Sequence, residues 1–282
     1  MSFMLEPERV YISVDMEGIT GVIDGSQTGS DPTEYAYYRK MMAGDLNAAI
    51  EGALEAGVKD IVVADSHGSM RNLQPEDINE AAYLIRGNPR PLLMMAGIDE
   101  GYDAAFYIGY HAMAGAEHAI LAHTIDGGAI DAVYVNGRRT GEFGLNAALA
   151  GWYDVPSVFV SGDLAFCEEA VDFVPKVSTA AVKWALGRES AKCLHPNKAR
   201  KLIKETAKNS LMKIKEVEPF WFNQPIEVKV RWRSPTMADA VSILPYMERI
   251  DGKTTKEEFD DYPTAFRGLR ASIYVASAAL RR

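Results

Sequence analysis

The chain has 282 residues, a formal net charge of −9 at pH 7 and only two cysteines, Cys167 and Cys193. This length can bury a sizeable hydrophobic core, and two thiols exclude both a disulfide framework and a four-cysteine zinc site. An acidic balance without a basic tract argues against non-specific binding to nucleic acid or to an anionic membrane. Residues 1–9 lack a signal-peptide pattern, and no apolar run reaches the ~20 residues that span a bilayer, so we expect a cytoplasmic protein with reduced thiols.

The N-terminal part of the chain predicts a strand, a helix and a second strand. The apolar run at residues 10–14 is typical of a buried strand. Asp31, followed by Pro32, is a favourable helix start, and Gly57 is a favourable residue just beyond the helix end. Residues 58–64 predict the next strand. This order is typical of a right-handed βαβ unit in a parallel sheet.

The middle of the chain predicts three more strands, a hairpin and a helix. The strands are expected near residues 83–85, 104–109 and 156–160. Asn136-Gly137 lies between two extended segments and favours a tight hairpin turn, because both turn residues must take positive φ. Residues 142–152 predict a helix.

The pattern changes after about residue 190. It predicts a Lys-rich amphipathic helix at 196–214, an alternating strand at 226–233, a helix start of the capping-box type at 254–258 and a terminal helix at 264–280. We therefore expect an α/β fold. Residues 1–190 would form a three-layer α/β/α core with a mostly parallel sheet, and residues 191–282 a smaller α+β part.

Three of the predicted strands end in side chains that can bind a metal. Asp15 and Glu17 follow the first strand, His67 follows the second, and His111 follows the strand near residue 109. In open parallel sheets, ligands bind outside the carboxyl ends of the strands. Asp15 and Glu17 are two residues apart and would point to the same side of an extended chain. Paired carboxylates repel each other unless a cation lies between them.

Each of these residues also has a simpler interpretation. Asp15 and Glu17 can form a solvated acidic turn, His67 an exposed turn and His111 a buried histidine with satisfied hydrogen bonds. Glu142 can be a first-turn acid that complements a helix dipole. Together, however, the five form a mixed nitrogen and oxygen set that suits Zn²⁺, with Mn²⁺ or Co²⁺ as alternatives. Five ligands fit two ions if one carboxylate bridges them.

The remaining histidines of this region, His118 and His123, are candidates for other roles. His123 can act as an acid or base beside a metal site. His118 follows Glu117 and is expected to face solvent. Asp65 can orient a ligand histidine by a hydrogen bond. Cys167 and Cys193 have no sequence context that indicates a nucleophile, and we expect ordinary reduced cysteines.

These motifs make the chain resemble the zinc-dependent D-aminopeptidase family of the dipeptide-operon type. The resemblance lies in Ser13-Val-Asp15-Met-Glu17-Gly18, Asp65-Ser-His67, Gly109-Tyr-His111-Ala112 and Gly141-Glu142-Phe-Gly144. It extends through Thr179-Ala-Ala-Val-Lys183 and Lys192-Cys-Leu194, and covers about residues 9–215.

The resemblance implies a centre with two zinc ions per subunit. Asp15 would bridge the ions, Glu17 and His67 would complete one, and His111 and Glu142 would complete the other. His123 matches the family's catalytic histidine, with His118 as a minor alternative. The resemblance also implies a ring-shaped homo-oligomer, a decamer.

The expected function is hydrolysis of short peptides or amides with an N-terminal D-amino acid, such as D-Ala-D-Ala. One alternative is another dinuclear metallohydrolase, an amidase or a phosphoesterase. Phosphate chemistry is the weaker of these, because no Gly-rich loop with a lysine precedes a helix. The other alternative is a non-catalytic peptide-binding or transport-associated protein, against which the presence of all five ligands and His123 argues.

Overall fold

The computed structural model describes residues 7–279. Residues 1–6, which belong to the segment tested for a signal-peptide pattern, and residue 280, the last of the predicted terminal helix, lie outside this range. Within it, no helix combines the length and the apolar character needed to cross a membrane.

The larger of two sheets has seven strands in the order β3-β2-β1-β4-β7-β8-β9. Neighbouring strands are parallel except for the β8–β9 pair, so the predicted mostly parallel sheet is confirmed. The strands are β1 (Arg9–Val14), β2 (Asp60–Asp65), β3 (Ala82–Ile85), β4 (Ala104–Tyr110), β7 (Ser157–Asp163), β8 (Ser178–Gly187) and β9 (Ser190–Cys193).

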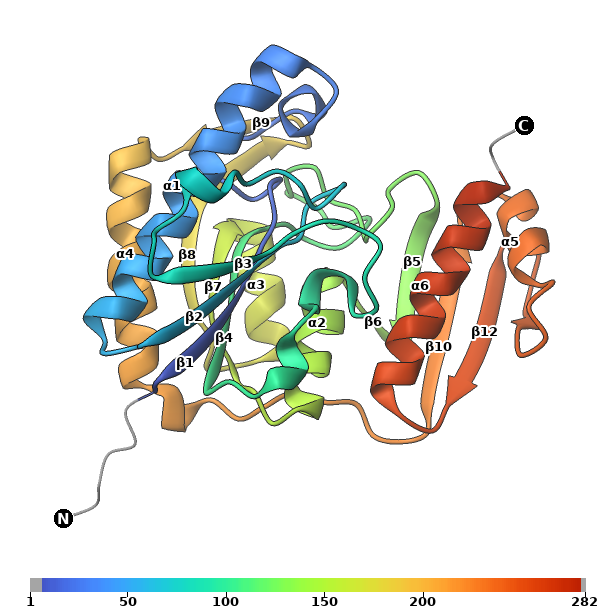
Figure 1. The fold of residues 1–282 in the computed structure, drawn as a ribbon. Coiled ribbons are helices and arrows are strands. Elements are labelled where there is room, and N and C mark those ends of the chain that lie inside the picture. Colours follow the sequence, from blue (N-terminus) through green and yellow to red (C-terminus); the bar gives the residue numbers. More distant parts are fainter. Residues whose placement is uncertain (1–6, 280–282) are drawn as a thin grey trace.

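Helices cover both faces of this sheet (Figure 1), which confirms the three-layer α/β/α architecture. Helices α1 (Pro32–Glu55) and α4 (Pro196–Met212) pack against each other on one face, and α2 (Glu142–Trp152) and α3 (Leu164–Phe173) cover the other. The connection from β1 to β2 and the connection from β4 to β7 cross the sheet in opposite directions. Because both crossovers are right-handed, their helices are expected on opposite faces of the sheet.

The first helix begins where the sequence predicts. The Asp31 side chain accepts hydrogen bonds from the backbone N–H groups of Thr33 and Glu34, and Pro32 is the first helical residue. Gly57 follows the helix end with a φ of 97°, a value that suits glycine. Short 3₁₀ helices form at Gly25–Thr28, Pro75–Asp77, Leu93–Met95, Ile98–Glu100 and Ile214–Glu216.

The second sheet is antiparallel, with the order β11-β12-β10-β5-β6. Its strands are β5 (Ile130–Val135), β6 (Arg138–Arg139), β10 (Ile226–Trp232), β11 (Glu248–Arg249) and β12 (Thr254–Phe259). Helix α6 (Tyr262–Ala278) lies between this sheet and α2, and α5 (Pro235–Val241) packs against α6 (Figure 1).

One predicted helix start is wrong. Residues 254–258 belong to strand β12, which pairs along its length with β10. The helix begins later, where the Asp261 side chain accepts a hydrogen bond from the backbone N–H of Thr264. The Thr-Thr-Lys-Glu-Glu segment satisfies a local capping pattern, but strand pairing with a distant segment decides its conformation.

The proposed division near residue 190 remains a prediction, and neither sheet follows it strictly. Strands β5 and β6 precede residue 190 yet belong to the second sheet. Helix α4 follows residue 190 yet packs on α1 of the larger unit. The contact of α6 with α2 connects the second sheet to the larger one.

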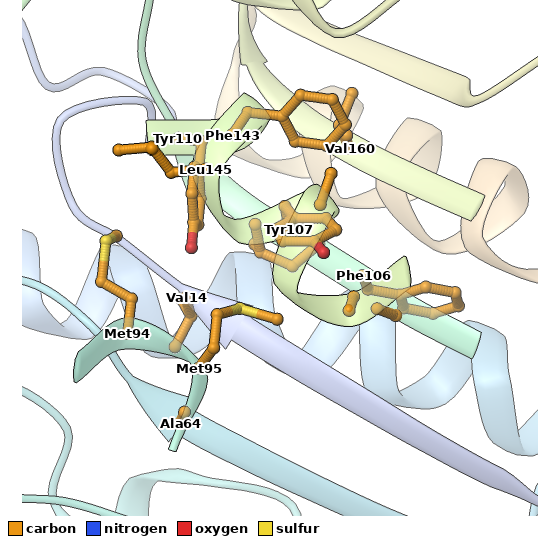
Figure 2. Close-up of a cluster of buried hydrophobic side chains, with 14 of the residues drawn as sticks. Val14, Ala64, Met94, Met95, Phe106, Tyr107, Tyr110, Phe143, Leu145 and Val160 are labelled. Atoms are coloured by element: carbon orange, nitrogen blue, oxygen red, sulfur yellow. The ribbon is translucent and has the colours of Figure 1, made fainter. Parts of the chain in front are cut away.

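A layer of buried aromatic and apolar side chains lies between the larger sheet and α2 (Figure 2). Tyr107 packs edge-to-face against Phe143, with ring centroids 5.0 Å apart. The Tyr110 hydroxyl is hydrogen-bonded to Ser13 at 2.6 Å and to Asn146 at 2.9 Å. Closely packed interiors resist local shifts. This layer therefore fixes the ends of β1 and β4, where the candidate ligands follow.

Candidate metal centre

The candidate residues meet at the carboxyl ends of three adjacent strands. Asp15 directly follows β1, His111 directly follows β4, and His67 is the second residue after β2. Strand β1 lies between β2 and β4, and the chain reverses its direction across the sheet at this point. Such a switch point is where open α/β sheets bind ligands. The structure thus brings together residues that are about a hundred positions apart in the sequence.

Two glycines allow the segments after β1 and β4 to approach closely. The Gly18 N–H donates to the Gly109 carbonyl at 2.7 Å, and a Cβ atom at Gly18 would overlap the carbonyl oxygen of Tyr110. Gly109 has a φ of 69°, which suits glycine. This close approach places Asp15 beside His111.

A cavity of about 110 Å³ opens at this edge of the sheet. Asp15, Glu17, His67, His123 and Glu142 are among its lining residues. The His111 side chain is 1% exposed and lies within ion-pair distance of two of them. Asp15, Glu17 and Glu142 are 2%, 6% and 3% exposed, so none of them is a solvated acid, although Glu142 does lie in the first turn of α2.

The imidazole of His67 contacts two carboxylates through one nitrogen. Its Nδ1 lies 3.2 Å from Asp15 Oδ1 and 3.0 Å from Glu17 Oε2. Its Nε2 lies 2.8 Å from the carbonyl oxygen of Thr28. A carbonyl oxygen only accepts, so Nε2 carries the hydrogen. In the neutral ring, the Nδ1 lone pair therefore faces two carboxylate oxygens.

His111 and His123 show the same arrangement with the two nitrogens exchanged. The Nδ1 of His111 donates to the Ala112 carbonyl at 3.0 Å, and the Nδ1 of His123 donates to Leu121 at 2.9 Å. The Nε2 of His111 lies 3.5 Å from Asp15 Oδ2 and 3.4 Å from Glu142 Oε1, and it is buried without a hydrogen-bond partner. The Nε2 of His123 lies 3.7 Å from Glu142 Oε1, and the two rings stack with centroids 4.1 Å apart.

Burial and charge shift the pKa values of this cluster strongly. Burial, and then the negative charge of Glu17, raises the pKa of Asp15 to about 7. Burial also acts to raise the pKa of Glu17, but the charge and hydrogen bond of His67 outweigh it and hold that pKa well below its ordinary value. Burial alone would lower the pKa values of His67 and His111, yet the neighbouring carboxylates raise both well above the ordinary value. The carboxylates therefore require positive charge between them.

The donor set fits a metal ion at these positions. Two ligand atoms that are each about 2.0–2.1 Å from a tetrahedral Zn²⁺ lie roughly 3.3 Å apart. The nitrogen–oxygen distances that involve His67 and His111 are 3.0–3.5 Å. Each histidine also donates its other N–H to a backbone carbonyl, the usual way in which a protein orients a ligand imidazole. His123, Glu142 and His111 form a second compact group of possible ligand atoms, beside the group of Asp15, Glu17 and His111.

The expected role of Asp65 is modified, and the expected exposure of His118 is confirmed. The Asp65 carboxylate does not contact the imidazole of His67: it accepts from the backbone N–H groups of Asn72 at 2.6 Å and Leu73 at 2.8 Å. Asn72 in turn donates to the His67 carbonyl at 2.7 Å, so Asp65 acts on the backbone of this loop. His118 is exposed and belongs to neither compact group.

Sequence reasoning missed two residues of the site. Lys183, on β8, donates from Nζ to the backbone carbonyls of Glu17, Ile19 and Val22. Lys183 is the only charged residue of this strand, and this was a signal that could have identified it. Arg270, on α6, lines the cavity, and nothing in its local sequence indicates this.

Comparison with known proteins agrees with this geometry. A family model described as D-aminopeptidase matches residues 9–271. The D-aminopeptidase of Bacillus subtilis (strain 168) is 35% identical over 247 residues, which cover 88% of this chain and 89% of the relative. A solved structure, the Zn-dependent D-aminopeptidase DppA from Bacillus subtilis, described as a self-compartmentalizing protease, superposes with a TM-score of 0.92 at 32% identity and covers 95% of this chain and 98% of its own. The chain belongs to the D-aminopeptidase family.

Proposed function

We propose that this protein is a dinuclear zinc aminopeptidase that hydrolyses short peptides or amides with an N-terminal D-amino acid. The observation that carries the proposal is the spacing of the buried histidine nitrogens and carboxylate oxygens, 3.0–3.5 Å, which suits shared metal ligation. Membership of the D-aminopeptidase family supports the reaction, and the related zinc-dependent structure supports the choice of metal.

We assign Asp15 as the bridging ligand, because its two oxygens face different histidines. Oδ1 lies beside His67 and Oδ2 beside His111. Glu17 and His67 would then complete one site, and His111 and Glu142 the other. When bound, two zinc ions supply a water of lowered pKa and polarise the scissile carbonyl. The backbone N–H of Ile125 donates to Glu142 Oε1 at 2.6 Å and orients that carboxylate.

We assign proton transfer to His123. Its Nδ1 hydrogen is committed to Leu121, so Nε2 is the nitrogen that can accept a proton from the cavity. Burial, and then the charge of His111, lowers the pKa of His123, which favours the neutral ring near pH 7. A neutral imidazole at the cavity wall can take a proton from the attacking water and return it to the leaving amine.

Replacement of metal ligands tests the proposal. We expect the wild type to retain about two zinc ions per chain after dialysis, and Glu17→Gln and His67→Ala to lose at least one and about 100-fold or more of the hydrolysis of D-Ala-D-Ala. Zinc is counted by elemental analysis, and a phosphomonoester and L-Ala-L-Ala are assayed in parallel. His118→Ala, an exposed histidine, is the control and should keep both metal and activity. Full turnover by metal-free protein would contradict the proposal.

We also propose a ring-shaped homo-oligomer, a decamer, that works in the cytoplasm. The related DppA structure is described as self-compartmentalizing, and it covers 95% of this chain. Cys193 is exposed and Cys167 is buried, and both are free thiols. Free thiols are typical of proteins from a reducing compartment.

A further inference from the structure

A single arginine from the C-terminal helix reaches the metal cavity. Among the described residues that line this cavity, Arg270 is the only lysine or arginine. It lies on α6, which packs between the second sheet and α2 and so brings a distant part of the chain to the site. The metal ligands and His123 all precede it by more than a hundred residues.

The guanidinium of Arg270 is held by neutral groups only. Its Nη2 donates to Asn88 Oδ1 at 3.1 Å and to the Tyr274 hydroxyl, and its central carbon lies 4.0 Å from the centre of the Tyr274 ring. The Nε atom is buried and has no hydrogen-bond partner. Within residues 7–279, no carboxylate forms an ion pair with Arg270. The side chain is thus positioned and charged, and its charge is not compensated.

Arg90, a neighbouring arginine, is a comparison for Arg270, because its guanidinium has a structural role. Its Nε, Nη1 and Nη2 donate to the backbone carbonyls of Leu93, Ile85 and Asp65 at 2.6, 3.3 and 2.5 Å. Those three bonds anchor the loop before the 3₁₀ helix Leu93–Met95. Arg270 has no comparable set of carbonyl acceptors, so holding the loop does not account for its position.

Within the described residues, Arg270 lacks an anionic partner. A guanidinium recognises a carboxylate through two parallel N–H donors, and the interaction is strong where water is limited. Under the proposed function, on which this step rests, Asp15, Glu17 and Glu142 would hold the metal ions and their negative charge would be neutralised. The positive charge of Arg270 is then available for the ligand.

We propose that Arg270 is a specificity-determining residue that binds the C-terminal carboxylate of a dipeptide substrate. The cavity volume of about 110 Å³ is well below the ~300–1,000 Å³ of ordinary ligand pockets, which favours a short substrate. Arg270 also lines a shallower groove with Pro89, Pro91 and Tyr274, so it lies at the outer edge of the cavity.

A matched pair of substrates tests this role. D-Ala-D-Ala and D-alanyl-D-alaninamide differ only in the terminal carboxylate. We expect zinc-loaded Arg270→Met to lose about 10- to 100-fold in kcat/KM for D-Ala-D-Ala, mainly through a higher KM, and to change by less than about twofold for the amide. Arg270→Lys keeps the charge but not the paired donors, and an intermediate loss is expected.

Arg231→Met is the control variant, because Arg231 is exposed on β10 and lines neither the metal cavity nor the shallower groove. It should behave as the wild type with both substrates, and circular dichroism verifies folding of all variants. Equal losses for both substrates in Arg270→Met, or no loss for D-Ala-D-Ala, would overturn the role of Arg270. If the wild type cleaves neither substrate, the proposed function is wrong. Calorimetric binding of the same two molecules to wild type and Arg270→Met then decides the role of Arg270 separately: a selective loss for the acid supports it, and equal affinities overturn it.

Discussion

Lys183 is the residue on which the loop after β1 depends most directly. It is fully buried, and its ammonium group lies under that loop and donates to three of its backbone carbonyls. Burial lowers the pKa of Lys183 to about 8. One of the three acceptors is the carbonyl of Glu17, whose side chain contacts His67. A change at Lys183 should therefore reach the metal centre through the backbone.

We predict that Lys183→Met lowers both stability and zinc affinity. Three buried carbonyls lose their donor, and each buried unpaired group costs about 1 kcal/mol or more, so the free energy of unfolding should fall by roughly 3 kcal/mol. Loss of a group that supports a ligand typically weakens metal binding by about 10- to 100-fold. Urea unfolding and competition with a zinc chelator measure the two effects.

The matched control is Lys192→Met, because Lys192 is exposed on the adjacent strand β9. It should leave both measurements unchanged. If Lys183→Met is less stable but binds zinc as tightly as the wild type, then Lys183 supports the fold only, and the predicted effect on the metal centre is wrong.

At the scale of elements, strand β12 places a carboxyl group inside the second half of the protein. Glu257 lies opposite Val228 of β10, is 3% exposed, and its Oε2 has no hydrogen-bond partner. Burial raises the pKa of Glu257 to about 8. The next residue, Glu258, points to the other side of the strand and is exposed.

We predict that the Glu257 carboxyl group on this strand makes the free energy of unfolding fall as the pH rises. The unfolded chain releases the Glu257 proton near its ordinary pKa of about 4.5, whereas the folded chain keeps it up to about 8. The folded state binds more protons between these values, so its stability decreases with pH across this window. Glu257→Gln should match the wild type near pH 4 and be more stable at pH 8 by on the order of 4 kcal/mol.

Urea unfolding of both proteins at several pH values tests this difference. Glu258→Gln is the control, and its stability should follow that of the wild type at each pH. A constant difference between Glu257→Gln and the wild type across the range would contradict the predicted proton uptake on folding.

At the scale of the whole molecule, one chain supplies every candidate ligand. Four of them follow the carboxyl ends of strands of the larger sheet, and the fifth begins helix α2: Asp15, Glu17, His67, His111 and Glu142. Helix α6 adds Arg270 from the second half of the same chain. Zinc binding should therefore not depend on assembly, whereas the access of substrates to the site would depend on it if the proposed ring forms.

We predict a native particle of ten copies of the 31.0 kDa chain, about 310 kDa. Light scattering after size-exclusion chromatography measures this mass, and dilution followed by elemental analysis tests whether zinc remains on smaller species. A mass of one chain at assay concentration would contradict the proposed ring. It would leave the assignment of the metal ligands unaffected, because their geometry is complete within one protomer.

Local sequence was sufficient to predict most of the larger sheet and the residues that gather at its edge. Apolar runs mark β1, β2 and β4, and each is followed by a side chain suited to metal ligation. Since parallel strands end at a common edge, chain order alone predicted that Asp15, His67 and His111 would meet. The capping of α1 is equally local and was also predicted.

Tertiary structure decided what depends on distant partners. Strand β12 forms because it pairs with β10, although its sequence resembles a helix start. Lys183 and Arg270 belong to the site because strand β8 and helix α6 lie next to it in the folded structure. The local sequence pattern predicts neither of these packing arrangements. Sequence by itself therefore determined which side chains can bind metal, since ligand chemistry is a property of residue type. The folded structure alone determined which charges surround them, since those charges come from elements far apart in the chain.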